Sequence, residues 1–225
     1  MLFNLPNQLQ DKIQLGRTPL ELLTRSKFLD VIDLFKINLQ PQINQITDHY
    51  DYDDIWTIVG ASHLGCIYIL DWWLKAHLST GLKLKYNYHG INAASGEGHV
   101  EILEWWLKAN KETGLNLKYT ENAIYVASRM GHIEILDWWL KALNESGLEF
   151  KYDKWAMNVA STHGHVKVLD WWLKAHNESG LELKYSKWLM KFAINQASLN
   201  GHTEVLEWWK NSGLKVPEGC KVYQL

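Results

Sequence analysis

Histidine has the widest chemical scope of the residues in this sequence, because its side chain can bind metal ions and transfer protons near neutral pH. The chain has ten histidines, and four of them recur at one position of a repeated segment: His99, His132, His165 and His202. Helical units in a stack lie about 8–10 Å apart, whereas zinc requires each ligand nitrogen at about 2 Å. Histidines of neighbouring repeats therefore cannot share an ion. We predict that each bonds to the backbone of the adjacent repeat, and we expect no metal site.

Enzymatic chemistry is not indicated by any other pattern. The sequence contains no Gly-x-Ser-x-Gly elbow, no phosphate-binding loop and no His-Glu-x-x-His motif. The recurring carboxylates each precede a lysine by four residues, as Glu104 precedes Lys108, which predicts ion pairs on an exposed helix face. Catalysis needs one unique cluster, whereas a repeat spreads each residue type along a line. We expect no enzymatic activity and no cofactor.

Lysine and tyrosine also recur together, in a pattern that nucleic-acid surfaces can use. The four pairs are Lys85-Tyr86, Lys118-Tyr119, Lys151-Tyr152 and Lys184-Tyr185. The alternative is a tyrosine packed between repeats, with the lysine stem in solvent. The 23 basic and 25 acidic residues give a net charge of -2, so the chain has no general attraction for phosphates. This balance favours packing, and we expect no nucleic-acid partner.

The composition points to an intracellular globular protein, in the cytoplasm or the nucleus. Hydrophobic residues make up 47% of the chain and charged residues 21%, which is typical of a folded domain. Cys66 and Cys220 lie far apart, so neither a disulfide framework nor a cysteine zinc site is expected. No apolar run of about 18 residues is present, and residues 1–7 do not resemble a signal peptide. We therefore expect a monomer that does not bind membranes.

The chain is unusually rich in tryptophan, and ten of its 13 tryptophans form five adjacent pairs. The pairs are Trp72-Trp73, Trp105-Trp106, Trp138-Trp139, Trp171-Trp172 and Trp208-Trp209. The first four pairs follow at intervals of 33 residues, and the fifth follows after 37. A fixed period of this length indicates stacked structural units that bury their apolar faces only against one another.

Each repeat is predicted to contain two helices. The second helix should run from about His99 to Lys111, because its apolar residues recur at helical spacing. The second tryptophan of each pair should lie on the buried face of this helix, and the first should pack against the adjacent repeat. The first helix should start at a capping residue, which is Thr120, Asp153 or Ser186 in successive repeats. A glycine should end each helix, and the Gly-Leu-x-apolar-Lys-Tyr linker should cross between them as extended chain.

This pattern resembles the ankyrin repeat, whose consensus runs roughly G-x-T-P-L-H-x-A-A-x-x-G-H-x-x-I-V-x-x-L-L-x-x-G-A-D. The matching residues of one repeat are 94–103, then Trp106-Leu107, then Gly114, and the match recurs five times. The resemblance implies an all-α, ankyrin-like helical repeat solenoid. It also implies that the chain binds a protein partner on the concave face of that solenoid.

The sequence departs from the consensus in ways that affect the binding surface. No clear repeat contains Thr-Pro-Leu-His, and Gly114 and Gly131 are 17 positions apart, four fewer than in the consensus. We therefore expect little or no β-hairpin finger. The final repeat has 21 positions from Gly180 to Gly201, so its first helix should gain a turn at residues 190–193.

We predict three regions along the chain. Residues 1–48 form an N-terminal helical region, in which Gly16 to Leu23 resembles the start of a degenerate capping repeat. Alternatively, Leu5 to Ile13 resembles the start of an F-box, the adaptor that docks substrates to ubiquitin ligases. Residues 49–215 form five ankyrin-like repeats, and residues 216–225 form a C-terminal tail.

Repeat scaffolds keep framework positions constant and vary surface positions, which identifies candidate binding residues. They are Asn92, Glu97, Tyr125, Arg129, Met130, Asn158, Thr162 and His163. The predicted function is a protein–protein interaction scaffold. Two alternatives remain open, namely an F-box and ankyrin substrate adaptor of a ubiquitin ligase, and a purely structural or designed repeat array.

Overall fold

The structure is a computed structural model that describes residues 57–81 and 83–218. The chain divides into two units, Met1–Asp48 and His49–Leu225, and all described residues belong to the second. The capping-repeat and F-box predictions for residues 1–48 lie outside the described residues. The described part is all-helical and contains no strand, so its linkers cross between helices without a β-hairpin. No helix in this part is long and apolar enough to cross a membrane.

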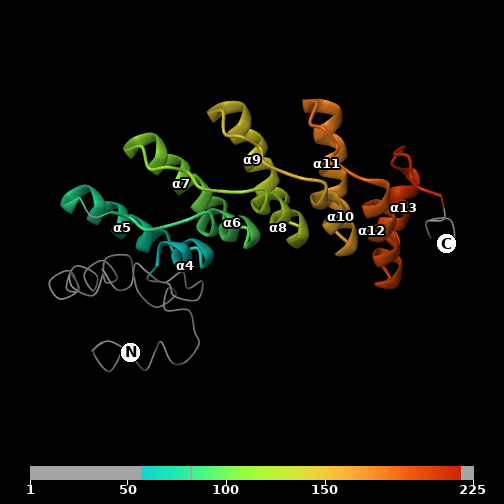
Figure 1. Ribbon diagram of the computed structural model, residues 1–225, viewed down its shortest axis with the longest axis horizontal. Coiled ribbons are helices and arrows are strands. Elements are labelled where there is room, and N and C mark those ends of the chain that lie inside the picture. The colour runs from blue at the N-terminus through green and yellow to red at the C-terminus, as the bar shows by residue number, and fades with distance from the viewer. Residues whose placement is uncertain (1–56, 82, 219–225) are drawn as a thin grey trace, which may run out of the picture. The chain divides into compact units, whose positions relative to one another are not determined.

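The helices follow one another in pairs, as Figure 1 shows. The first helices of the pairs are α4 (Ile58–His63), α6 (His89–Gly96), α8 (Asn122–Met130), α10 (Trp155–Thr162) and α12 (Lys187–Leu199). The second helices are α5 (Ile67–Thr80), α7 (Val100–Thr113), α9 (Ile133–Ser146), α11 (Val166–Ser179) and α13 (Thr203–Asn211). Each first helix contacts the next first helix, and each second helix contacts the next second helix. The contacts are more extensive in the row of first helices, and the second helices fan apart (Figure 1).

The second helices agree closely with the sequence prediction. Helix α7 begins one residue after His99 and ends at Thr113, where Gly114 adopts a left-handed conformation with φ 74°. Ile102, Leu103 and Trp106 are all buried on its inner face. The predicted face and the glycine stop are therefore confirmed, and the helix ends two residues later than expected.

The first helices confirm one of the three predicted starts and shift the other two. Ser186 is the N-cap of α12, and its side chain accepts a hydrogen bond from the Leu189 amide. Thr120 and Asp153 each lie one residue before the N-cap of their helix. The Thr120 side chain accepts a hydrogen bond from the Asn122 amide at 3.2 Å, and the Asp153 side chain accepts one from the Trp155 amide at 2.9 Å. Helix α12 has 13 residues and α8 has nine, which confirms the additional turn.

The second tryptophan of each pair forms the core of the interface between repeats. Trp139 is 2% exposed, and its Nε1 donates to the Ser95 hydroxyl of the preceding repeat at 3.2 Å. The same hydroxyl donates to the Ile91 carbonyl at 2.9 Å. Equivalent bonds join Trp106 to Ser62 and Trp209 to Ser161, at 3.2 and 3.0 Å. The serine of the small Ala-Ser step is therefore an acceptor as well as a small residue.

The first tryptophan of each pair corrects the prediction for the recurring carboxylates. Trp138 is buried and donates to the Glu104 carboxylate of the preceding repeat at 2.7 Å. Three further bonds follow the same rule: Trp105 to Asp71, Trp171 to Asp137 and Trp208 to Asp170. The predicted pairing of Glu104 with Lys108 is wrong, because Lys108 lies 3.9 Å from Glu112 instead. These carboxylates connect repeats.

We expect that replacing Asp137 with leucine lowers the free energy of unfolding by about 1.5–3 kcal/mol, the range for a hydrogen bond to a charged group. The substitution leaves the buried indole N–H of Trp171 without its acceptor. Asp137→Asn is the control, because an amide oxygen can still accept the bond, and it should cost less. Urea unfolding of the full chain measures both values. Equal losses in the two variants would contradict the role of the hydrogen bond.

Candidate functional site

The recurring lysines and tyrosines are occupied within the repeat interfaces. The Tyr86 hydroxyl donates to the Asn116 carbonyl at 2.8 Å, and the Lys118 ammonium lies 4.5 Å from the Tyr86 ring centroid. That ammonium also donates to the Tyr86 carbonyl at 3.0 Å. The prediction that the tyrosines pack between repeats is confirmed, whereas the lysines are bound to the neighbouring repeat rather than simply solvated.

The four recurring histidines lie against the left-handed glycines of the preceding repeats. A Cβ atom added to Gly98 would come within 2.9 Å of the His132 ring, and one added to Gly131 within 2.8 Å of the His165 ring. His165 is hydrogen-bonded to the backbone of Arg129, in agreement with the prediction. The His132 and His99 rings instead lie 3.1 and 3.6 Å from Glu134 and Glu101 of their own repeats, so the prediction does not hold for every repeat. In residues 57–81 and 83–218, no group of three or more histidine, cysteine, aspartate or glutamate side chains could hold a metal ion.

Burial lowers the pKa of His165 below its ordinary value of 6.5, and the neighbouring histidines lower it further. The unfolded chain therefore binds a proton at a higher pH than the folded chain does. The stability that comes from the neutral ring is complete above about pH 6.5 and is lost as the pH falls through the lower pKa of the folded state.

We expect the free energy of unfolding to fall between about pH 7.5 and about pH 5.5, partly through His165. A His165→Gln variant cannot titrate at this position, so its stability should fall less over the same interval. Urea unfolding at several pH values measures both slopes. Identical slopes in the two proteins would show that protonation of His165 does not affect stability.

The structure divides the predicted binding residues between two hollows in the row of first helices. A hollow of about 250 Å³ between α6 and α8 is lined by Asn92, Glu97, Arg129 and Met130 among others. Asn92 is buried, its Nδ2 donates to the Thr120 hydroxyl at 2.8 Å, and its Oδ1 accepts from the Thr120 amide at 3.2 Å. The expectation that Asn92 presents a free surface side chain is therefore wrong, because this residue joins α6 to Thr120, two residues before α8.

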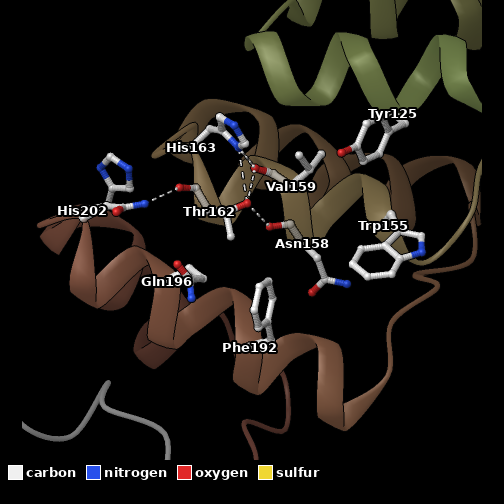
Figure 2. A pocket seen from close by; sticks show the side chains of 10 residues that line it. Tyr125, Trp155, Asn158, Val159, Thr162, His163, Phe192, Gln196 and His202 are labelled. Atoms are coloured by element: carbon white, nitrogen blue, oxygen red, sulfur yellow. Dashed lines mark hydrogen bonds between the residues drawn. The ribbon is translucent and has the colours of Figure 1, made fainter.

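The other four predicted residues lie together in a larger groove of about 490 Å³ on α8, α10 and α12, which we call the α10 groove (Figure 2). It is lined by Tyr125, Trp155, Asn158, Val159, Thr162, His163, Phe192, Gln196, Asn200 and His202. The sequence prediction included Tyr125, Asn158, Thr162 and His163 but missed the aromatic residues of α10 and α12.

Three aromatic side chains of α10 and α12 are exposed to solvent, and we call them the groove aromatics: Trp155, Phe192 and Trp188. Trp155 and Phe192 line the groove and are 39% and 44% exposed. Trp188 is 69% exposed and stacks on Phe192, with ring centroids 6.0 Å apart and planes at 12°. A sequence signal exists for this cluster, because Trp155 and Trp188 are two of only three tryptophans outside the repeated pairs.

The polar residues of the α10 groove differ in whether they are free to bind a ligand. The Thr162 hydroxyl donates to carbonyls of its own helix, at 3.0 and 2.9 Å, and the His163 ring Nδ1 lies 2.9 Å from the Val159 carbonyl. Asn158 is only 2% exposed, and its Nδ2 donates to the Lys154 carbonyl. Its Oδ1 has no partner, and Figure 2 shows the carboxamide between Trp155 and Phe192. A buried carbonyl oxygen without a donor is unusual in a folded protein.

The charges around the α10 groove are segregated. Helices α10 and α12 contain no acidic residue, and Lys154, Lys187 and Lys191 are exposed on or next to them. No described carboxylate lies within ion-pair distance of these three lysines. Glu121 and Asp153 line an adjoining hollow, shared with Tyr125 and Trp155, on the α8 side.

Comparisons with known proteins add no family to this description. No family model and no curated protein matches the chain.

Proposed function

We propose that this chain is an ankyrin-like helical repeat solenoid that serves as a protein–protein interaction scaffold. The row of first helices would be its concave face, and the partner protein would bind in the α10 groove. The observation that carries this proposal is the exposure of the groove aromatics Trp155, Phe192 and Trp188. Exposed aromatic clusters mark interaction sites, and tryptophan and tyrosine contribute most to binding energy at protein interfaces.

The contrast with the framework supports this choice of site. The paired tryptophans between repeats are buried wherever both neighbours are described, and most of their indole N–H groups bind the preceding repeat. The groove aromatics take no part in this framework. Trp155 and Trp188 lie 33 residues apart, at one position of two successive repeats, and both are exposed. A purely structural or designed array would need none of them, so their presence favours a binding function over that alternative.

The ligase-adaptor alternative depends on an F-box in residues 1–48, which are outside the described residues. A substrate adaptor would still need a surface that binds its substrate, and the α10 groove could serve as that surface. Pull-down of the full chain with the adaptor subunit of the ligase tests this alternative, because an F-box protein is captured and a simple scaffold is not. We expect a scaffold without enzymatic activity, acting inside the cell.

Affinity capture from the source-cell lysate, followed by mass spectrometry, tests the proposal when wild type and variants are compared. The Trp155→Ala/Phe192→Ala double variant should lose a protein that wild type retains. Leu78→Ala is the matched control, because Leu78 is an exposed apolar residue of α5, which is a second helix. This variant should capture the same proteins as wild type. If every captured protein binds the double variant as well as wild type, the α10 groove is not the binding site.

A further inference from the structure

We infer that the α10 groove binds an extended peptide segment in which a large apolar residue lies close to one or more acidic residues. This inference rests on the proposed function and names the chemistry of the partner. Three features carry it: exposed aromatic rings in the groove, a buried acceptor without a donor, and unpaired lysines on or next to the helices that form the groove.

The exposed rings of the groove accommodate the apolar side chain. Trp155 and Phe192 contribute exposed rings from two neighbouring helices, with the Asn158 carboxamide between them (Figure 2), and Val159 also lines the groove. The volume of about 490 Å³ falls within the range of about 300–1,000 Å³ that is common for ligand sites. An aliphatic or aromatic side chain placed there would cover ring surface that now faces water.

The buried acceptor selects a donor from the ligand. Asn158 Oδ1 has no partner, although Asn158 is almost fully buried, at 2% exposed. Because this oxygen is itself covered, a ligand reaches it when a neighbouring groove side chain moves aside. A carbonyl oxygen accepts hydrogen bonds only, so an N–H group satisfies it, whereas a carboxylate or phosphate oxygen does not. Every residue of a peptide except proline carries such an N–H on its backbone. The backbone beside the apolar residue is the group that fits.

The exposed lysines next to the groove determine where the acidic residues of the bound peptide lie. Lys187 and Lys191 lie one turn apart on α12, which also provides Phe192, and Lys154 directly precedes Trp155. These cations have no carboxylate partner among the described residues. Glu121 and Asp153 line the adjoining hollow with Tyr125 and Trp155, and Asp153 directly precedes Lys154, so Lys187 and Lys191 are the lysines that lie away from these carboxylates in sequence. Acidic residues of a ligand are therefore attracted to the α12 side and repelled from the α8 side, which fixes the direction of the segment.

A single-stranded nucleic acid fits this surface less well, although bases also stack on aromatic rings. Its phosphates recur along the whole strand and need a continuous basic track. Here the two carboxylates on the α8 side interrupt that track, and the net charge of the chain is -2. The observations therefore favour a peptide.

A random-peptide display library panned on the full chain tests the inference. We expect the enriched peptides to share a large apolar residue with aspartate or glutamate nearby. A synthetic peptide of the enriched sequence is then titrated by fluorescence polarisation. Trp155→Ala should weaken its binding at least about tenfold, and Lys187→Glu/Lys191→Glu should weaken it about tenfold at low ionic strength, with a smaller effect at high salt.

Lys141→Glu/Lys174→Glu is the matched control, because it makes the same charge change at exposed positions of α9 and α11 and should leave the affinity within about twofold. Circular dichroism melting curves check that all variants are folded. Enriched peptides that need Trp155 but carry no acidic residue, and bind the Lys187→Glu/Lys191→Glu variant normally, would overturn the inference while leaving the proposed function intact.

Three other results would also overturn it. If no peptide is enriched, the groove does not recognise an extended segment. Peptides that bind equally well after Trp155→Ala and Phe192→Ala would defeat both the inference and the proposed function. Tighter binding of poly-uridine RNA than of any enriched peptide, lost in the Lys187→Glu/Lys191→Glu variant, would assign the groove to nucleic acid.

Discussion

Replacing Trp139 with alanine should lower the free energy of unfolding by about 3–5 kcal/mol, the usual cost of removing a large buried aromatic side chain. The Trp139 ring contacts Tyr119 and Trp138, with ring centroids 4.6 and 5.0 Å apart. Its Nε1 bonds to Ser95 of the preceding repeat. In a linear array each repeat is held only by its neighbours, so a cavity at one interface weakens the whole row.

Guanidinium unfolding of the full chain measures this loss, and Lys141→Ala is the control. Lys141 lies two residues further along α9, and its side chain is 62% exposed. Its replacement should cost less than about 0.5 kcal/mol. Equal losses in the two variants would mean that the buried face of α9 has been assigned wrongly.

A second pair of variants separates the hydrogen bond from the packing. Trp172 occupies the same position in the next repeat, but neither its Nε1 nor the Ser128 hydroxyl has a partner. Trp139→Phe removes both packing surface and a hydrogen bond, whereas Trp172→Phe removes packing surface alone. Trp139→Phe should therefore cost about 1 kcal/mol more.

Replacing Gly131 with alanine should destabilise the chain by at least about 2 kcal/mol, for two reasons. Gly131 has φ 83°, a left-handed conformation that is strained for alanine. The added Cβ would also lie 2.8 Å from Nδ1 of the His165 ring, and that ring is held between repeats. Thermal or urea unfolding measures the loss.

Gly114→Ala is the matched control for this prediction. Gly114 has φ 74°, and an added Cβ would meet nothing within 4 Å. Only the backbone strain remains there, so the expected cost is about 1 kcal/mol. The difference between the two variants measures the contact between the histidine and the glycine. If Gly131→Ala costs no more than Gly114→Ala, that contact does not stabilise the stack.

The helices and the interface tryptophans could be predicted because their signals lie within one repeat. Trp106 falls on the face of Ile102 and Leu103 through helical spacing alone, and Gly114 ends the helix through its own conformational freedom. Glu104 was assigned to the wrong partner for the opposite reason. Its partner, Trp138, lies 34 residues away in sequence, and the period inside one helix carries no information about such a contact.

The α10 groove could be predicted only in part. Comparing equivalent positions identified Tyr125 and Asn158, but variation alone cannot distinguish a surface residue from one that joins two repeats, as Asn92 does. Trp155 was missed although Trp188 follows it after one full period of 33 residues, because the comparison began three residues later, at Asn158. Phe192 was missed because it lies in the longer α12. An exposed aromatic residue that only some of the repeats carry at a given position, as with Trp155 and Trp188, is the better signal for a site.

The indole hydrogen bonds of the paired tryptophans all run backwards, from each repeat to the one before it. The donor and acceptor are 34 residues apart for Trp138 and Glu104 but 38 apart for Trp208 and Asp170, because α12 is longer. The longer first helix leaves the bond between second helices intact. Recombination that duplicates or deletes one whole 33-residue period would therefore present the first indole of each pair with an equivalent carboxylate. Evolution can thus change the number of repeats, and the distance of the α10 groove from either end of the array, and still keep a carboxylate acceptor for the first tryptophan of each pair.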